Sequence, residues 1–271
     1  MIGSIEESET HTISFDDQTI YFYTVGNKSD PPLVFLHGIL AFTEAYSDFI
    51  ENLSKKYFVI GIDLRGHGRS SVGQRPFSFK DITKDIVKVT NALDIEKFYV
   101  VGHSAGGFIA LSLIKYFPEK VIKGASIASL YNHAGIDYAD TGHDYLTEQG
   151  FQANNNLRNN YTLKIADLAY EKMGEKEKFD QTKKIMMDYG NIMYPSFSDS
   201  ILQEILTPIL VFVAQKDKRI KPEHTTKMAE LLPNSKLIIV EGARHFGITK
   251  KKRYVKILSD EIFEFFSKYE E

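Results

Sequence analysis

The sequence predicts an α/β fold built on a mostly parallel, doubly wound sheet, and two observations favour this class. First, six short apolar runs lack the alternation of half-exposed strands, which is typical of strands buried on both faces. Second, segments with helical periodicity separate several of these runs, and a repeated strand–helix–strand order predicts parallel strands covered by helices on both sides. The six runs cover residues 33–36, 58–62, 98–101, 121–127, 209–214 and 237–240.

An antiparallel edge is predicted before the first parallel strand. Residues 19–25 alternate in character, and the chain then breaks at Gly26-Asn27 and at Pro31-Pro32. Alternation followed by turn residues predicts antiparallel edge strands closed by a turn.

Helical periodicity predicts the layers that cover the sheet. Ser78 and Asp81 have the spacing of a capping box at the start of a helix over residues 78–93. Further helices are predicted over residues 105–116 and 250–269. The apolar side chains that fall on one face of the first and last of these helices are Ile82, Ile86, Val89 and Leu93, and Val255, Leu258, Ile262 and Phe265.

Residues 130–200 break this alternation of strands and helices. They contain no run of the buried-strand type, but they include helix-like stretches at 163–173 and 176–189. We therefore expect a helical cap at 130–200, inserted into a core domain formed by residues 1–129 and 201–271.

Ser104 is the strongest candidate for a catalytic residue. It lies in the pentapeptide Gly-His-Ser-Ala-Gly at residues 102–106, which has the form G-x-S-x-G and joins a predicted strand to a predicted helix. A serine on such a turn presents its hydroxyl from a strained backbone, and glycine neighbours avoid collisions with the strand and the helix. This context, more than the motif alone, favours a nucleophile over an ordinary loop serine.

A base and an orienting acid are expected after later strands, because a serine hydroxyl is a poor nucleophile on its own. His245 follows the run 237–240, and Asp217 follows the run 209–214. Taken alone, each is more often a surface or capping residue. The chain order Ser104, Asp217, His245 is the order expected after this type of turn, so we assign them as nucleophile, acid and base.

These motifs resemble those of the α/β-hydrolase superfamily. His37-Gly38-Ile39 follows the predicted strand 33–36 and is similar to the family's oxyanion loop. Residues 63–70, Asp-Leu-Arg-Gly-His-Gly-Arg-Ser, are similar to the loop after the next strand in its cofactor-free members. The resemblance covers nearly the whole chain and implies an α/β-hydrolase fold in which the cap is the variable part.

The resemblance also implies an acyl-transfer mechanism. The backbone amides of Ile39 and Ala105 would form the oxyanion hole. A single glycine, Gly38, stands where enzymes that accept bulky alcohols carry three, which indicates simple ester substrates. We expect a carboxylesterase that cleaves small or medium acyl esters. The same triad also serves lactones, carbon–carbon bonds and acyl transfer or perhydrolysis on this scaffold, and a non-catalytic ligand-binding protein is the alternative from another class.

Three other histidines near these motifs are expected to support the site without exchanging protons. By resemblance, His103 packs toward the sheet, while His37 and His67 brace their loops.

Candidates for the substrate pocket lie in the cap and beside His245. We predict four substrate-binding residues: Met187, Met193, Tyr194 and Phe246. Met186, Tyr189 and Phe197 are further apolar candidates. Packing of the cap against the core explains the cap residues equally well.

Composition excludes several other classes. The 271 residues carry a net charge of −3 without a basic stripe, which argues against a nucleic-acid partner. The chain has no cysteine, no cluster with metal-ligand spacing and no phosphate-binding glycine loop, so we expect neither metal nor cofactor. Its N-terminal segment is acidic, and no stretch reaches about 18 apolar residues. We expect a cytoplasmic protein with a small-molecule substrate and no membrane partner.

Overall fold

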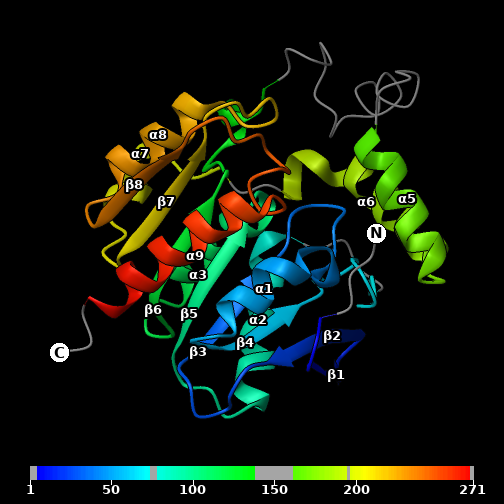
Figure 1. The fold of residues 1–271 in the computed structure, drawn as a ribbon. Coiled ribbons are helices and arrows are strands. Elements are labelled where there is room, and N and C mark those ends of the chain that lie inside the picture. The colour runs from blue at the N-terminus through cyan, green and yellow to red at the C-terminus, as the bar shows by residue number, and fades with distance from the viewer. Residues whose placement is uncertain (1–4, 74–77, 138–160, 194–195, 269–271) are drawn as a thin grey trace.

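The computed structural model of the chain describes residues 5–73, 78–137, 161–193 and 196–268, and their side chains except at 161–164 and 185–193. Within this part, eight strands form one sheet in the order β1-β2-β4-β3-β5-β6-β7-β8 (Figure 1). The strands are β1 (Glu9–Phe15), β2 (Gln18–Val25), β3 (Pro32–Leu36), β4 (Phe58–Ile62), β5 (Phe98–His103), β6 (Val121–Ile127), β7 (Ile209–Ala214) and β8 (Ser235–Val240). All six predicted parallel strands are present, and the predicted bounds of β4, β6 and β7 are confirmed.

The antiparallel edge is confirmed, but the predicted place of its turn is wrong. β2 pairs antiparallel with β1 and with β4, and every pair from β4 to β8 is parallel. The hairpin turns at Asp16 and Asp17, between Phe15 and its partner Gln18, with Asp16 in the left-handed region (φ 53°). The breaks at 26–27 and 31–32 lead instead from β2 to β3, which are not neighbours in the sheet.

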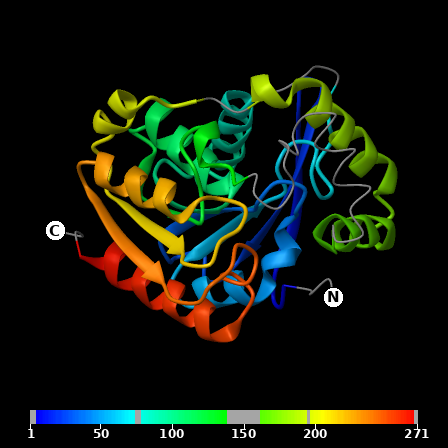
Figure 2. The ribbon, with the colours of Figure 1, turned by 90° about the horizontal axis from the view of Figure 1, so that it is seen from above.

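Helices cover both faces of the sheet, as predicted (Figure 2). α1 (Ser47–Leu53) and α9 (Lys252–Ser267) pack on one face, and α2 (Phe79–Ala92), α3 (Ala105–Tyr116), α7 (Asp199–Gln203) and α8 (Pro222–Leu231) pack on the other. The capping box of α2 is confirmed, because Ser78 accepts from the Asp81 amide while the Asp81 carboxylate accepts from the Ser78 amide.

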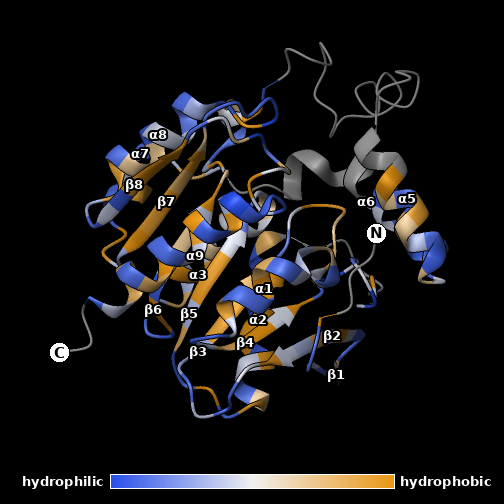
Figure 3. Cartoon of the chain, viewed as in Figure 1, coloured by the Kyte–Doolittle hydropathy of each residue, from blue (hydrophilic) through white to orange (hydrophobic). Residues whose placement is uncertain are grey.

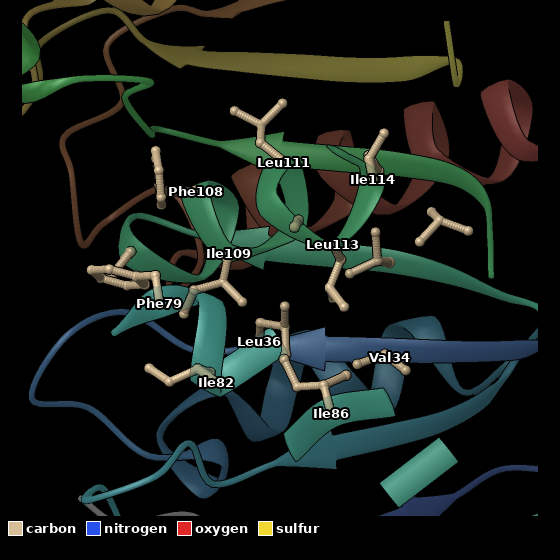
Figure 4. Packing of buried hydrophobic residues seen from close by; sticks show 14 of the residues in the cluster. Val34, Leu36, Phe79, Ile82, Ile86, Phe108, Ile109, Leu111, Leu113 and Ile114 are labelled. Atoms are coloured by element: carbon tan, nitrogen blue, oxygen red, sulfur yellow. The ribbon is translucent and has the colours of Figure 1, made fainter. Parts of the chain in front are cut away.

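Two apolar layers hold the helices to the sheet. Between β3 and the helices α2 and α3, buried side chains such as Leu36, Ile86 and Phe108 interdigitate (Figure 4). On the opposite face, Phe49 of α1 and Leu258 of α9 pack against the central strands. The central strands are accordingly apolar along much of their length, whereas the outer faces of α1, α8 and α9 are polar (Figure 3). This rigid sheet fixes the loops at its carboxyl edge.

Besides α7, the described part of the chain between β6 and β7 contains two longer helices. α5 (Tyr161–Lys172) and α6 (Lys176–Met193) lie side by side at one end of the molecule (Figures 1 and 2). Phe42, after β3, forms a small apolar cluster with Ala169, Tyr170 and Phe179 of these helices. Among the helices described, none is both long and apolar enough to cross a membrane.

Candidate active site

Ser104 lies on a tight turn between β5 and α3. Its φ of 55° and ψ of −121° are strained for a residue with a side chain, as expected for a nucleophile turn. A Cβ at Gly102 would lie 2.1 Å from the carbonyl oxygen of Gly106, and a Cβ at Gly106 would lie 2.2 Å from that of Leu36. Glycine at both positions therefore allows β5, α3 and β3 to approach closely around the turn.

The end of β6 and the residues after it hold the same turn from the other side. The Ser104 amide donates to the carbonyl oxygen of Ile127 at 2.9 Å. The Ser129 hydroxyl donates to the carbonyl oxygen of Ser104 at 2.7 Å. Both hydrogen bonds reach the backbone of Ser104 and therefore fix its position without using its own side chain.

Ser104, His245 and Asp217 come together at the carboxyl edge of the sheet. His245 Nε2 lies 3.0 Å from Ser104 Oγ, and His245 Nδ1 lies 2.7 Å from Asp217 Oδ2. His245 and Asp217 are buried, and Ser104 is partly exposed. Ser104 follows β5, Asp217 follows β7 and His245 follows β8. The three residues meet because parallel strands direct the loops at their carboxyl ends to a common edge.

The surroundings of Asp217 favour its ionised form. Burial alone would raise the pKa of Asp217, but the nearby His245 and the hydrogen bonds from His245 and two backbone amides outweigh it, and the pKa lies below its ordinary value. The two amides, of Arg219 and Ile220, donate to Oδ1 at 2.8 and 3.1 Å. Asp217 is therefore suited to hold a proton on His245 Nδ1 and leave Nε2 free to accept the proton of Ser104.

The loop after β3 lies directly against Ser104. A Cβ at Gly38 would lie 3.3 Å from Ser104 Cβ. The Ala41 amide donates to the Gly38 carbonyl oxygen at 3.2 Å, and Leu40 has a φ of 55°. Residues 38–41 therefore form a tight turn with a positive φ at its third position.

The backbone amides of Ile39 and Ala105 lie beside Ser104, and neither is used in the hydrogen bonds that form the turn at 38–41 or the helix α3. The turn at 38–41 closes through the Ala41 amide, so the Ile39 amide takes no part in it. Ala105 is the first residue of α3, where an amide has no acceptor inside the helix. These are the two predicted oxyanion-hole amides, and they belong to the two elements that meet at Ser104.

His37 and His67 contact loops, as predicted. His37 Nδ1 donates to the carbonyl oxygen of Gly38 at 2.7 Å, and Nε2 accepts from the Leu64 amide at 3.0 Å. His67 Nδ1 donates to the carbonyl oxygen of Arg65 at 3.0 Å. Burial lowers the pKa of His37 to about 4 and, together with the neighbouring His37, that of His67 to about 3. Both rings therefore brace the loops as neutral groups.

Of the predicted pocket residues, Phe246 and Phe197 have described side chains. Phe246 is 42% exposed and stands edge-on to the His245 ring, with 4.8 Å between centroids. Phe197 is buried and packs on Phe108 of α3, so its contacts are those of the core. The remaining candidates lie outside the described residues or side chains: Met186, Met187, Tyr189, Met193 and Tyr194.

Tyr170 of α5 makes hydrogen bonds to the loops after β3 and β4 that the sequence did not predict. Its buried hydroxyl accepts from the Gly68 amide at 2.8 Å and donates to the carbonyl oxygen of Ala41 at 3.0 Å. The Thr182 hydroxyl of α6 donates to the carbonyl oxygen of Gly66 in the same loop. The only sequence signal was the predicted helix around Tyr170, which indicates a buried ring but not its hydroxyl partners.

The arrangement can activate a serine and stabilise an oxyanion. The described residues hold no group of three histidine, aspartate or glutamate side chains placed to bind a metal ion. The groups that this arrangement brings together for chemistry are the hydroxyl of Ser104, the imidazole of His245 and backbone amides.

Comparisons with known proteins agree with this fold. Residues 31–172, just over half of the chain, match the model of the α/β-hydrolase fold family. A Haemophilus influenzae protein with the provisional name esterase/lipase is 25% identical over 83% of this chain and 80% of its own length. The (E)-2-((N-methylformamido)methylene)succinate hydrolase of Acinetobacter baylyi is 23% identical over 85% of this chain and 88% of its own.

Solved structures show the same architecture. A serine hydrolase from Cycloclasticus zankles superposes with a TM-score of 0.77 at 19% identity, over 95% of this chain and 98% of that chain. With the sheet order, the helical layers and the family match in agreement, the chain belongs to the α/β-hydrolase family.

Proposed function

We propose that this hydrolase cleaves carboxylic esters with small or medium acyl groups through an acyl-enzyme on Ser104. The observation that carries the proposal is the continuous series of contacts from Asp217 through His245 to the Ser104 hydroxyl, at 2.7 and 3.0 Å. Such a series removes the hydroxyl proton as the oxygen attacks, which is the step that a serine cannot perform alone at neutral pH.

The first half-reaction forms the acyl-enzyme. Ser104 Oγ attacks the ester carbonyl carbon while His245 Nε2 takes the hydroxyl proton, and Asp217 stabilises the imidazolium. The amides of Ile39 and Ala105 donate to the oxyanion of the tetrahedral intermediate. When the intermediate collapses, His245 gives its proton to the oxygen of the leaving alcohol.

The second half-reaction repeats these roles with water. His245 takes a proton from water as the water oxygen attacks the acyl carbon, and the same two amides hold the oxyanion. Collapse returns the proton to Ser104 and releases the carboxylic acid. No external oxidant, reductant or cofactor is consumed.

We assign the acyl and alcohol groups to an apolar pocket between the core and a cap at residues 130–200. Phe246 is the member of this pocket that stands beside His245. Met187, Met193 and Tyr194 of the cap remain our candidates for the rest of the lining. A pocket of this kind orients the substrate through apolar contact and leaves the polar work to Ser104 and the amides.

The proposal is tested by hydrolysis of p-nitrophenyl esters of increasing acyl length. Wild type should cleave one length class efficiently, and Ser104→Ala should lose this activity while unfolding at the same temperature. Ser112→Ala is a matched control, because it removes a buried serine hydroxyl from α3 that donates a hydrogen bond to the carbonyl oxygen of Phe108, within its own helix.

Labelling with a fluorophosphonate separates the competing functions. A protein that is labelled at Ser104 but cleaves simple esters poorly would use the serine on a lactone, a carbon–carbon bond or an acyl acceptor other than water. A folded protein that is neither labelled nor active would be a non-catalytic ligand-binding member of the family, and the proposal would be wrong.

A further inference from the structure

We propose that Tyr46 and His103 form a buried relay that positions the oxyanion loop and His245 relative to each other. The inference rests on the function proposed for Ser104 and His245, and it assigns roles to two residues outside that triad. The Gly38 amide donates to the Tyr46 hydroxyl at 3.1 Å. The same hydroxyl oxygen lies 2.9 Å from His103 Nδ1. His103 Nε2 in turn lies 2.9 Å from the carbonyl oxygen of His245.

For a neutral His103 ring, one placement of protons satisfies every contact in this relay. The Gly38 amide can only donate, and the His245 carbonyl oxygen can only accept. The Tyr46 oxygen therefore accepts from Gly38 and gives its own proton to His103 Nδ1. The ring proton of His103 then lies on Nε2 and is donated to His245. If the Tyr46–His103 bond were reversed, the ring proton would lie on Nδ1, and Nε2 would face the His245 carbonyl oxygen as one acceptor against another.

The surroundings keep the relay in this state. His103 is fully buried and Tyr46 nearly so, and a buried polar group without a partner is costly. Burial, with His245 next in effect, lowers the pKa of His103 to about 3, so the ring stays neutral. The titratable or charged groups that face it are Tyr46, His245, Asp217 and Lys250.

The two ends of the relay explain what it would position. Gly38 immediately precedes Ile39, whose amide we assign to the oxyanion hole. His245 carries the general base, and its ring lies 5.0 Å from the His103 ring. Because both ends are backbone atoms, Tyr46 and His103 fix the spacing between the base and the oxyanion loop without taking part in proton transfer. They are positioning residues.

Removal of the Tyr46 hydroxyl tests the relay in the enzyme. Tyr46→Phe keeps the ring but leaves the Gly38 amide and His103 Nδ1 without their partner. We expect kcat for a p-nitrophenyl ester and the rate of fluorophosphonate labelling to fall about tenfold, while KM stays within about twofold. Tyr131→Phe is the matched control, since it removes a tyrosine hydroxyl that donates to Asp199 at 2.9 Å and contacts none of the relay residues.

Two substitutions of His103 separate positioning from packing. Glutamine can present an amide donor near the position of Nε2, whereas leucine cannot. His103→Gln should therefore retain more of kcat than His103→Leu. A relay with a merely structural role would give variants that unfold earlier but keep the kcat of the wild type, and that result would overturn the inference.

The proton placement can be tested without any activity. Nitrogen-15 spectra of the histidine rings, assigned with His103→Gln, should show His103 neutral with its proton on Nε2 between about pH 5 and 8. A proton on Nδ1, or a charged ring in this range, would overturn the relay. If fluorophosphonate fails to label wild-type Ser104, the proposed function fails, while the spectra still decide whether the relay exists.

Discussion

Asp217 Oδ2 lies 2.7 Å from His245 Nδ1, while the other oxygen of the same carboxylate accepts from two backbone amides. One oxygen thus faces the imidazole, and the other is held by the loop that carries Asp217. This division lets the effect of the carboxylate on His245 be separated from its effect on the loop.

Asp217→Asn should lower kcat roughly 10⁴-fold with little change in thermal stability. The asparagine oxygen can still accept from the amides of Arg219 and Ile220, but its NH2 group would face His245 Nδ1 and favour the wrong tautomer. Ester hydrolysis and thermal unfolding measure the two effects. Asp199→Asn, at a half-exposed aspartate paired with Lys227, should keep the activity of the wild type. An Asp217→Asn enzyme within tenfold of wild type would refute the role assigned to Asp217.

Gly106→Ala should destabilise the protein by about 3 kcal/mol or prevent it from folding. The added Cβ would lie 2.2 Å from the carbonyl oxygen of Leu36, and backbone at the centre of the sheet cannot move aside. Gly247→Ala is the control, because its Cβ would meet no atom nearer than 3.6 Å, and it should change stability by about 0.5 kcal/mol or less. Urea unfolding measures both, and equal stability of the two variants would contradict the expectation.

Strands with a strong apolar pattern could be predicted from the sequence, and strands without one could not. β4 and β7 were predicted with their exact bounds because they are apolar runs that are mostly buried on both faces. The bounds of β6 were also predicted, although this strand includes Lys123 and Ser126 and exposes Ile122. β8 begins two residues before its predicted start, since Ser235 and Lys236 sit on a half-buried edge where polar residues are tolerated. β1 is mostly polar and exposed, so its range had no such signal and only pairing with β2 reveals it.

The candidate site divides in the same way. Ser104, Asp217 and His245 were predicted because a motif and the order of strands place them, although the sequence gives no distance between them. Tyr46 and Tyr170 were missed because each acts through a single hydroxyl on residues far away in the chain. Such contacts leave no local spacing or periodicity, and only the folded backbone brings the partners together.

Stability should fall steadily as the pH drops from about 7 to 4. Burial is the main cause that lowers the pKa of His37 to about 4 and the pKa values of His67 and His103 to about 3. Below about pH 6.5 the unfolded chain therefore binds protons at these residues while the folded chain does not, and the free energy of unfolding decreases. Each histidine contributes a slope of about 1.4 kcal/mol per pH unit.

His67→Asn isolates one of these contributions. Asparagine can keep the hydrogen bond to the carbonyl oxygen of Arg65, but it cannot bind a proton in the unfolded chain. Urea unfolding at several pH values gives the slope of the free energy of unfolding against pH. For this variant the slope should be smaller by about 1.4 kcal/mol per pH unit, the contribution of one histidine. An unchanged slope would mean that His67 is already charged in the folded protein.

Tyr170→Phe should loosen α5 and α6 without disturbing the sheet. The substitution leaves the Gly68 amide and the Ala41 carbonyl oxygen unpaired, while the ring keeps its stacking on Phe179 at 4.5 Å between centroids. An unpaired buried group costs about 1–3 kcal/mol, and here the cost falls on the contact between these helices and the loops after β3 and β4.

Hydrogen exchange measured by mass spectrometry locates this effect. Peptides from α5 and α6 should exchange faster in Tyr170→Phe than in wild type, while peptides from β5 and α3 should be unchanged. Tyr116→Phe, at a tyrosine that is 37% exposed on α3, is the control and should change neither set. Faster exchange spread evenly over the sheet would show that Tyr170 stabilises the whole fold. Exchange confined to α5 and α6 would show that its hydroxyl anchors these two helices to the loop that carries Ile39.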